Sequence, residues 1–144
     1  MGQAREAMDR LTEAVTTGGK PEAFREVFAE NVVAVTPDAG EIEGREKVVE
    51  YYQQMVEAFP GATYESVYSY ETGDTAIDEG FFNGRNTASL QLPTGETLPP
   101  THKDVRVRSC DAATIDSDGK IVSYRLYFDQ LDFLGQLGLV PEEA

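Results

Sequence analysis

Several residue types that support metal, redox or nucleotide chemistry are scarce in this sequence. The 144-residue chain has one cysteine, Cys110, one histidine, His102, and no tryptophan. A single cysteine excludes an internal disulfide, which fits a reducing cytoplasm. One histidine and one cysteine make a poor ligand set for a transition metal, and no His, Cys, Asp or Glu grouping has metal-ligand spacing. We therefore expect no metal ion at the functional site.

Positive charge is scarce too. The chain carries 12 lysines and arginines against 26 aspartates and glutamates, a net charge of −14 at pH 7. Phosphate groups are bound by lysine and arginine, so this balance argues against nucleic acid and anionic membrane surfaces as partners. No apolar run is long enough to cross a membrane, and residues 1–20 are polar and charged, unlike a signal peptide. We expect a single cytoplasmic domain over residues 1–144.

The order of predicted elements is helices first and strands afterwards, which is typical of an α+β fold. Apolar residues recur at helical spacing in three early segments. The predicted helices cover residues 3–17, a short segment from Pro21 that Asn31 breaks, and residues 45–59. The predicted strands cover residues 32–35, 64–71, 75–87, 102–114 and 121–128. Residues 88–100, with Pro93 and Gly95, indicate a loop or lid. No glycine-rich phosphate loop joins a strand to a helix, so no organic cofactor is expected.

The last thirty residues carry the most informative pattern. Asp116 to Gly119 is a turn signal, and the β-branched and aromatic run from Ile121 to Phe128 predicts a strand. Asp129 suits the N-cap of a closing helix that ends at Gly138. On one face of that helix we expect Leu131, Leu134 and Leu137.

This stretch, with its segments DGKIV, RLYFDQ and LGQLG, resembles the C-terminal signature of the SnoaL-like polyketide cyclases, in the NTF2-like superfamily. It also resembles the RDYFD segment of the limonene-epoxide hydrolases. The resemblance implies a cone-shaped fold, in which a strongly curved mixed sheet wraps around helices and encloses a deep pocket. It covers most of the chain, because Ala14 to Gly18, Gly44 and Gly84 to Asn86 fall in the same register.

The resemblance, combined with strand alternation, predicts which residues face the pocket. If Asp116 opposes Lys120 across the turn, then Ala112 opposes Tyr124, Cys110 opposes Leu126, and Asp111 opposes Arg125. The position of the catalytic aspartate in the relatives falls at Leu126, and that of the cyclases' pocket histidine falls at Ala112. An apolar inward set is expected: Cys110, Ala112, Tyr124, Leu126 and Phe128. Asp111 and Arg125 are expected outside, as a cross-strand ion pair.

Other residues complete the predicted site. Glu79 is the one carboxylate placed inward on the strand over 75–87, beside Phe81 and Asn83. It is either a general base with a raised pKa or a salt-bridged rim charge. His102 is either an acid–base group near the lid or an exposed loop residue. By resemblance Tyr51 contacts substrate, or else packs in the core, and Val15 supplies apolar wall.

Three classes of function remain open from the sequence. The resemblance implies a pocket for a mid-sized aromatic or polycyclic small molecule. In the first class the protein is a cofactor-free enzyme of secondary metabolism, such as antibiotic biosynthesis: an ester cyclase that closes a ring by aldol chemistry, a hydroxylase or an isomerase. In the second it is a non-catalytic binding protein, which the loss of the usual aspartate to Leu126 favours. In the third it is an interaction module, because cone-fold proteins often form homodimers through the outer sheet face.

Overall fold

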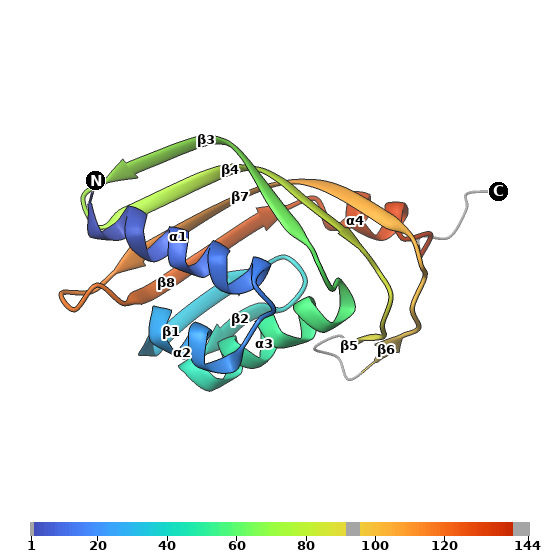
Figure 1. Ribbon diagram of the computed structural model, residues 1–144, viewed down its shortest axis with the longest axis horizontal. Helices are drawn as coiled ribbons and strands as arrows, with labels where there is room; N and C mark the ends of the chain where they lie inside the picture. The colour runs from blue at the N-terminus through green and yellow to red at the C-terminus, as the bar shows by residue number, and fades with distance from the viewer. Residues whose placement is uncertain (1, 92–95, 140–144) are drawn as a thin grey trace.

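A curved six-stranded sheet forms the frame of the molecule (Figure 1), and its strand order is β2-β1-β8-β7-β4-β3. The computed structural model describes residues 2–91 and 96–139. The strands of this sheet are β1 (Phe28–Thr36), β2 (Gly40–Glu43), β3 (Thr63–Thr72), β4 (Thr75–Arg85), β7 (Asp104–Ile115) and β8 (Ile121–Phe128). All neighbours are antiparallel except β1 and β8, which run parallel. The sheet is therefore mixed, and the predicted α+β class is confirmed.

Three helices pack against one face of this sheet: α1 (Gln3–Thr16), α2 (Pro21–Val27) and α3 (Arg45–Ala58). Each helix turns an apolar stripe toward the sheet because its apolar residues recur at helical spacing. Fully buried side chains of this helix layer include Met8, Phe24, Val48 and Val49, and Phe28 of β1 is fully buried as well. A short fourth helix, α4 (Gln130–Gln136), follows β8, and Asp129 caps it by accepting the amide of Asp132 at 3.0 Å.

A carboxylate from the sheet fixes the start of α1. Glu71, at the end of β3, accepts the backbone amides of Gly2 and Arg5 at 3.0 and 2.9 Å. These amides belong to the first turn of the helix, where amides lack partners within the helix. The bond from the Arg5 amide is the main reason that the pKa of Glu71 lies below its usual value. The N-terminus of α1 is thus attached to the β3–β4 hairpin (Figure 1).

Some predicted boundaries differ from the observed ones. The second helix ends at Val27, and β1 begins at once with Phe28, because Phe28 is a fully buried core residue of the strand. The segment predicted as a loop contains two short paired strands, β5 (Leu90–Gln91) and β6 (Thr97–Leu98). Pro93 and Gly95 lie outside the described residues. Leu131 of α4 is exposed, and Leu137, just beyond the end of α4, is buried, so the expected leucine face is wrong in part.

A bulge in β3 changes which side chains face the helices. Ser66 pairs with Gly80, but Tyr68 pairs with Glu79, so Val67 is an extra residue. Tyr64 therefore lies on the inner face, whereas Tyr68 is on the outer face and is 60% exposed. Unbroken alternation along the sequence predicts Tyr64, Ser66, Tyr68 and Tyr70 on one face. This prediction is wrong beyond Ser66, because a bulge inserts one residue and reverses the pattern after it.

A second bulge shifts the register between β7 and β8 by one residue. The turn itself pairs as expected, since the amide of Asp116 donates to the carbonyl of Lys120 at 2.9 Å. Ile115 then pairs with Ile121, but Thr114 pairs with Ser123, which leaves Val122 as the extra residue.

The shift changes the partners of Asp111 and Arg125. Asp111 opposes Leu126 instead of Arg125, and Ala112 opposes Arg125 instead of Tyr124. The predicted register is wrong because an ungapped count cannot detect a bulge.

We expect Gly80→Ala to destabilise the protein by about 2 kcal/mol or more. A Cβ at Gly80 would lie 1.9 Å from the backbone carbonyl oxygen of Glu65, so the bulged β3 strand would have to move. Gly84→Ala is the matched control, since its Cβ would meet the Phe59 side chain at 3.3 Å, where a small adjustment suffices. Urea unfolding of the three proteins measures the difference, and equal losses for the two variants would contradict this account.

Candidate functional site

A cavity of about 870 Å³ lies between the inner face of the sheet and the helices α1, α3 and α4. This volume falls within the range of small-molecule sites, roughly 300–1,000 Å³. Its wall is mostly apolar or aromatic away from the charged residues of β2 and α3. The main contributors from the sheet are Tyr64, Phe82, Val107, Ser109, Asp111, Tyr124, Leu126 and Phe128.

Four phenylalanines from four elements gather at one part of this wall. The ring centroid of Phe59, at the end of α3, lies 5.6 Å from that of Phe82 and 5.8 Å from that of Phe133. Phe133, on α4, also lies 5.7 Å from Phe128 in an edge-to-face arrangement. Such contacts favour a fixed arrangement of rings. They give the cavity a surface suited to an apolar or aromatic ligand group.

The deep wall carries an acid. Asp111, on β7, accepts the hydroxyl of Tyr124 at Oδ2, at 2.7 Å. Its other oxygen, Oδ1, is buried and has no hydrogen-bond partner among the described residues. Burial is the main reason that the pKa of Asp111 rises to about 7; the Tyr124 hydrogen bond opposes the rise and the charge of Asp78 adds to it. The carboxyl is therefore close to half-protonated at neutral pH.

Two further tyrosines lie beside this acid. Tyr64 directs its hydroxyl to the backbone carbonyl oxygens of Ser109 and Asp78, at 3.3 and 3.5 Å, and it lines the cavity. Tyr52 packs edge-on against Tyr124, with ring centroids 5.9 Å apart. Burial raises the pKa of Tyr52, Tyr64 and Tyr124 above the usual value, so all three keep their hydroxyl protons. Tyr64 and Tyr124 donate theirs, whereas the buried Tyr52 hydroxyl has no partner among the described residues.

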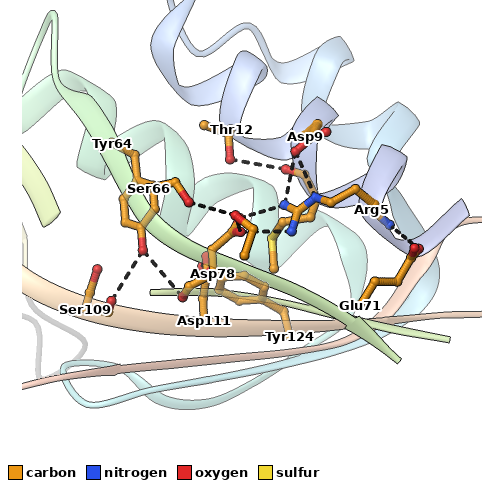
Figure 2. A network of polar contacts seen from close by, with 12 residues as sticks. Arg5, Asp9, Thr12, Tyr64, Ser66, Glu71, Asp78, Ser109, Asp111 and Tyr124 are labelled. Atoms are coloured by element: carbon orange, nitrogen blue, oxygen red, sulfur yellow. Dashed lines mark hydrogen bonds and ion pairs between the residues drawn. The ribbon is translucent and has the colours of Figure 1, made fainter. Parts of the chain in front are cut away.

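A buried ion pair adjoins Asp111 on the same face. Asp78, on β4, is the direct cross-strand neighbour of Asp111, and the guanidinium of Arg5 from α1 holds both oxygens of Asp78 at 2.9 and 2.7 Å. Figure 2 shows this network: the Arg5 side chain extends from α1 toward β4, and its guanidinium lies between Asp9 and Asp78. Ser69 donates a further hydrogen bond to Asp78 at 2.8 Å.

Toward β2 and α3 the wall becomes polar. Tyr51 donates its hydroxyl to the two oxygens of Asp38, at 3.0 and 3.2 Å. Burial, followed by the charge of Asp38, raises the pKa of Tyr51 well above the usual value. Glu43, Lys47 and Glu50 also line this part of the cavity, and all three are exposed to solvent.

A family model for the SnoaL-like domain matches residues 8–124. The chain belongs to the SnoaL-like family. No curated protein matches the sequence at a significant level.

Solved structures show the same fold. A proposed SnoaL-like polyketide cyclase from Jannaschia sp. CCS1 superposes with a TM-score of 0.80 at 20% identity, over 96% of this chain and 94% of the other. IdmH, a proposed polyketide cyclase from Streptomyces antibioticus, gives 0.73 at 26% identity, over 95% and 99%. A protein from Catenulispora acidiphila with a ketosteroid isomerase-like fold, in complex with trimethylamine, gives 0.74 at 19% identity, over 94% of each chain. The predicted family and the NTF2-like cone fold are confirmed.

Five of the predicted binding residues line the cavity of this SnoaL-like protein. They come from α1, α3 and β8: Val15, Tyr51, Tyr124, Leu126 and Phe128. Their binding role stays a prediction.

Four other predicted binding residues, Phe81, Asn83, Cys110 and Ala112, do not line it. For Cys110 and Ala112 the reason is the Val122 bulge, which turns both to the outer face. Phe81 and Asn83 alternate with the inward Phe82, and Phe81 stacks against Arg106, whose guanidinium lies 4.0 Å from the ring centroid.

The two predicted catalytic candidates also lie away from the cavity lining. Glu79 pairs with Tyr68 and Cys110 on the outer face, because the inward residues of β4 are the even-numbered ones, Asp78 among them. His102 is exposed in the segment before β7 and has a positive φ of 58°. Among the described residues, Asp111 is the acid that β7 and β8 contribute to the cavity wall, and the sequence predicted that it would lie outside; Glu41 and Glu43 line the cavity from β2.

The described residues also bear on metals and membranes. Over residues 2–91 and 96–139, no group of three or more His, Cys, Asp or Glu side chains is placed to hold a metal ion. None of the helices in that part of the chain is long and apolar enough to span a bilayer.

Asp111 should make the stability of this SnoaL-like protein fall as the pH rises from about 4 to about 7. A carboxyl with a folded-state pKa of about 7 keeps a proton that the unfolded chain, with a pKa of 3.8, releases in that window. The loss is on the order of 2–4 kcal/mol. Urea unfolding across pH 4 to 8 measures it, with Asp111→Asn as the variant that lacks this contribution. Parallel pH curves for parent and variant would show that Asp111 titrates normally.

Proposed function

We propose that this SnoaL-like protein binds a mid-sized aromatic or polycyclic molecule in the cavity and transforms it by acid–base chemistry, with Asp111 exchanging the proton. The proposal rests on the hydrogen bonding of this carboxyl. Tyr124 holds one oxygen, while the other is buried on the cavity wall without a partner. A buried acceptor without a partner costs free energy, and a ligand donor can satisfy it.

The proton affinity of Asp111 suits both directions of proton transfer. A general acid or base works best when its pKa lies near the working pH, and the pKa of Asp111 is about 7. The ionised carboxyl takes a proton from a carbon next to a ligand carbonyl, and the resulting enolate attacks a second carbonyl. The protonated carboxyl then returns that proton to the oxygen that becomes the new hydroxyl. An aldol ring closure is balanced by this one proton.

The shape of the wall supports an apolar substrate. The phenylalanine cluster, Phe59, Phe82, Phe128 and Phe133, offers ring edges and faces near one end of the cavity. IdmH, at 26% identity, is itself a proposed polyketide cyclase. The proton transfers above need only the carboxyl and the ligand, so we propose a cofactor-free reaction. An isomerisation would use the same group, because moving a double bond also begins with a proton taken beside a carbonyl.

The second candidate is a binding protein that carries or shields its ligand. Leu126 favours it, since this side chain lies directly opposite Asp111 and is apolar where the relatives are expected to carry an aspartate. Both candidates use the same cavity, and they differ only in whether Asp111 transfers a proton to bound ligand.

Asp111→Asn should lower kcat by about a hundredfold to ten-thousandfold, because the amide cannot exchange a proton. Its shape is nearly unchanged, so KM should change little. The measurement is turnover of polyketide esters and of a cyclic epoxide by the parent and the variant. Glu79→Gln is the matched control, since it removes a carboxylate from the outer face of the sheet. Full turnover in Asp111→Asn would refute Asp111 as the proton-transfer group, and ligand binding without turnover by the parent would establish the binding protein.

We also propose that the protein is a homodimer that forms through the outer face of the sheet. That face carries large side chains with no cover from this chain: Tyr68 and Tyr127 are 60% and 59% exposed. They stand at the two ends of one row across four strands, with Glu79 and Cys110 between them. A two-fold axis through this row would bury both tyrosines, because the same patch meets itself across such an axis.

Tyr127→Glu should convert the dimer to a monomer, since the new carboxylate would be desolvated in the same row as the carboxylate of Glu79, with no cation in that row to compensate it. Sedimentation velocity measures the mass. Leu131→Glu is the control, because Leu131 is also highly exposed but belongs to α4 and not to the outer sheet face. A monomeric parent, or a variant that stays dimeric, would rule out this interface.

A further inference from the structure

An arginine from the first helix reaches the sheet directly beside the proposed acid. The Arg5 guanidinium binds Asp78 through two parallel hydrogen bonds, from Nη1 to Oδ1 at 2.9 Å and from Nη2 to Oδ2 at 2.7 Å. The exposed fractions of the two side chains are only 12% and 5%. Two-point contacts of this kind fix the plane of the carboxylate as well as its charge. Asp78 is therefore paired with a cation and held in one orientation, next to Asp111.

The two carboxyls share one face of the sheet at adjacent positions. Asp78 and Asp111 are direct partners across β4 and β7, so their Cβ atoms are about 4.5–5.5 Å apart. Two carboxylates that close disfavour each other's ionisation. Asp78 raises the pKa of Asp111 by its charge, and Arg5 lowers it by the opposite charge. The proton affinity of Asp111 is thus the balance of burial, the Tyr124 hydrogen bond and the nearby ion pair.

Every element packed around Asp111 contributes a titratable or charged group. In chain order these groups are Arg5 and Asp9 on α1, Tyr52 on α3, Tyr64 on β3, Asp78 on β4 and Tyr124 on β8. The tyrosines are neutral, and Asp9 is 60% exposed, where solvent screens its charge. The only cation in this group is Arg5, and it contacts the carboxylate adjacent to Asp111.

We propose that Arg5 is a positioning residue of the site: by pairing with Asp78, it offsets the negative charge beside Asp111 and so lets Asp111 gain and lose its proton. This inference rests on the proposed function, because it explains how the proposed proton-transfer group is kept able to work in both directions. Without Arg5, Asp78 and Asp111 would compete for one proton as a coupled pair, and the second ionisation would occur only at higher pH.

A purely structural role for Arg5 predicts something different. If Arg5 only anchors α1, its removal would lower the free energy of unfolding and leave the pKa of Asp111 unchanged. The test must therefore measure the titration of the Asp111 carboxyl directly. We choose the titration of Asp78 and Asp111 by carbon-13 NMR of the side-chain carboxyls, in the ligand-free protein, for the parent, Arg5→Met, Asp78→Asn and the double variant.

The expected shifts have opposite signs. Arg5→Met should raise the midpoint of Asp111 by about one pH unit, because the cation that offsets Asp78 is gone. Asp78→Asn should lower it by a similar amount, because the adjacent negative charge is gone while Arg5 remains. The double variant should return toward the parent. If Arg5→Met fails to fold, the midpoint of Asp111 in Asp78→Asn still measures the interaction between Asp111 and the ion pair.

Two controls sharpen the outcome. Arg5→Lys keeps the charge but not the two-point contact, so it should restore most of the parent midpoint. Asp9→Asn removes the exposed partner of the same guanidinium and should shift the midpoint little. An Asp111 midpoint that is unchanged in both Arg5→Met and Asp78→Asn would overturn the inference. The titration needs no substrate, so the proposed function can fail, through full turnover in Asp111→Asn, while these shifts stand.

Discussion

The position of α1 on the sheet depends on carboxylates that the sheet supplies. Glu71 holds the backbone amides of Gly2 and Arg5, and Asp78 holds the side chain of the same Arg5. Breaking a buried ion pair by removing one partner typically costs about 3–5 kcal/mol, since the other charge is left uncompensated. The helix therefore cannot slide along the sheet without exposing Asp78. Since Leu11, Thr12 and Val15 of the same helix line the cavity, its width depends on these contacts.

The two bulges have complementary effects on the sheet. The bulge at Val67 brings the β3 backbone close to β4, where only a glycine, Gly80, leaves room. The bulge at Val122 turns Asp111 and Leu126 to the same side. Bulges increase local bending and twist, so each one also contributes to the curvature that makes a cavity instead of a flat, filled core. The bulges thus determine both which side chains line the cavity and how the sheet curves around it.

These bulges mark the limit of what the sequence predicts. Periodicity and turn residues predict the helices, most strands and the N-cap at Asp129, because those signals are local. The family resemblance predicts the cone, because its motif lies in the strand that the others surround. The sequence does not show that Val122 is unpaired, and that single residue decides between Asp111 and Cys110 as the inward side chain. One signal was available in the sequence: Asp78 and Asp111 are acids on consecutive predicted strands, and a buried pair of acids needs a cation.

Ligand binding should change the acid more than any other group in the site. The pKa of Asp111 is already raised chiefly by burial, and part of the residue still faces the open cavity. An apolar ligand would displace water from that space, and further desolvation raises the pKa of a carboxyl again. At neutral pH we therefore expect most of the bound complex to hold Asp111 protonated, with its unpartnered oxygen donating to a ligand carbonyl. The ionised fraction, which takes the proton from carbon in the proposed reaction, is then smaller than in the free protein. The charge of Arg5 opposes the rise in the pKa of Asp111, so it limits how far this fraction falls once the cavity is full.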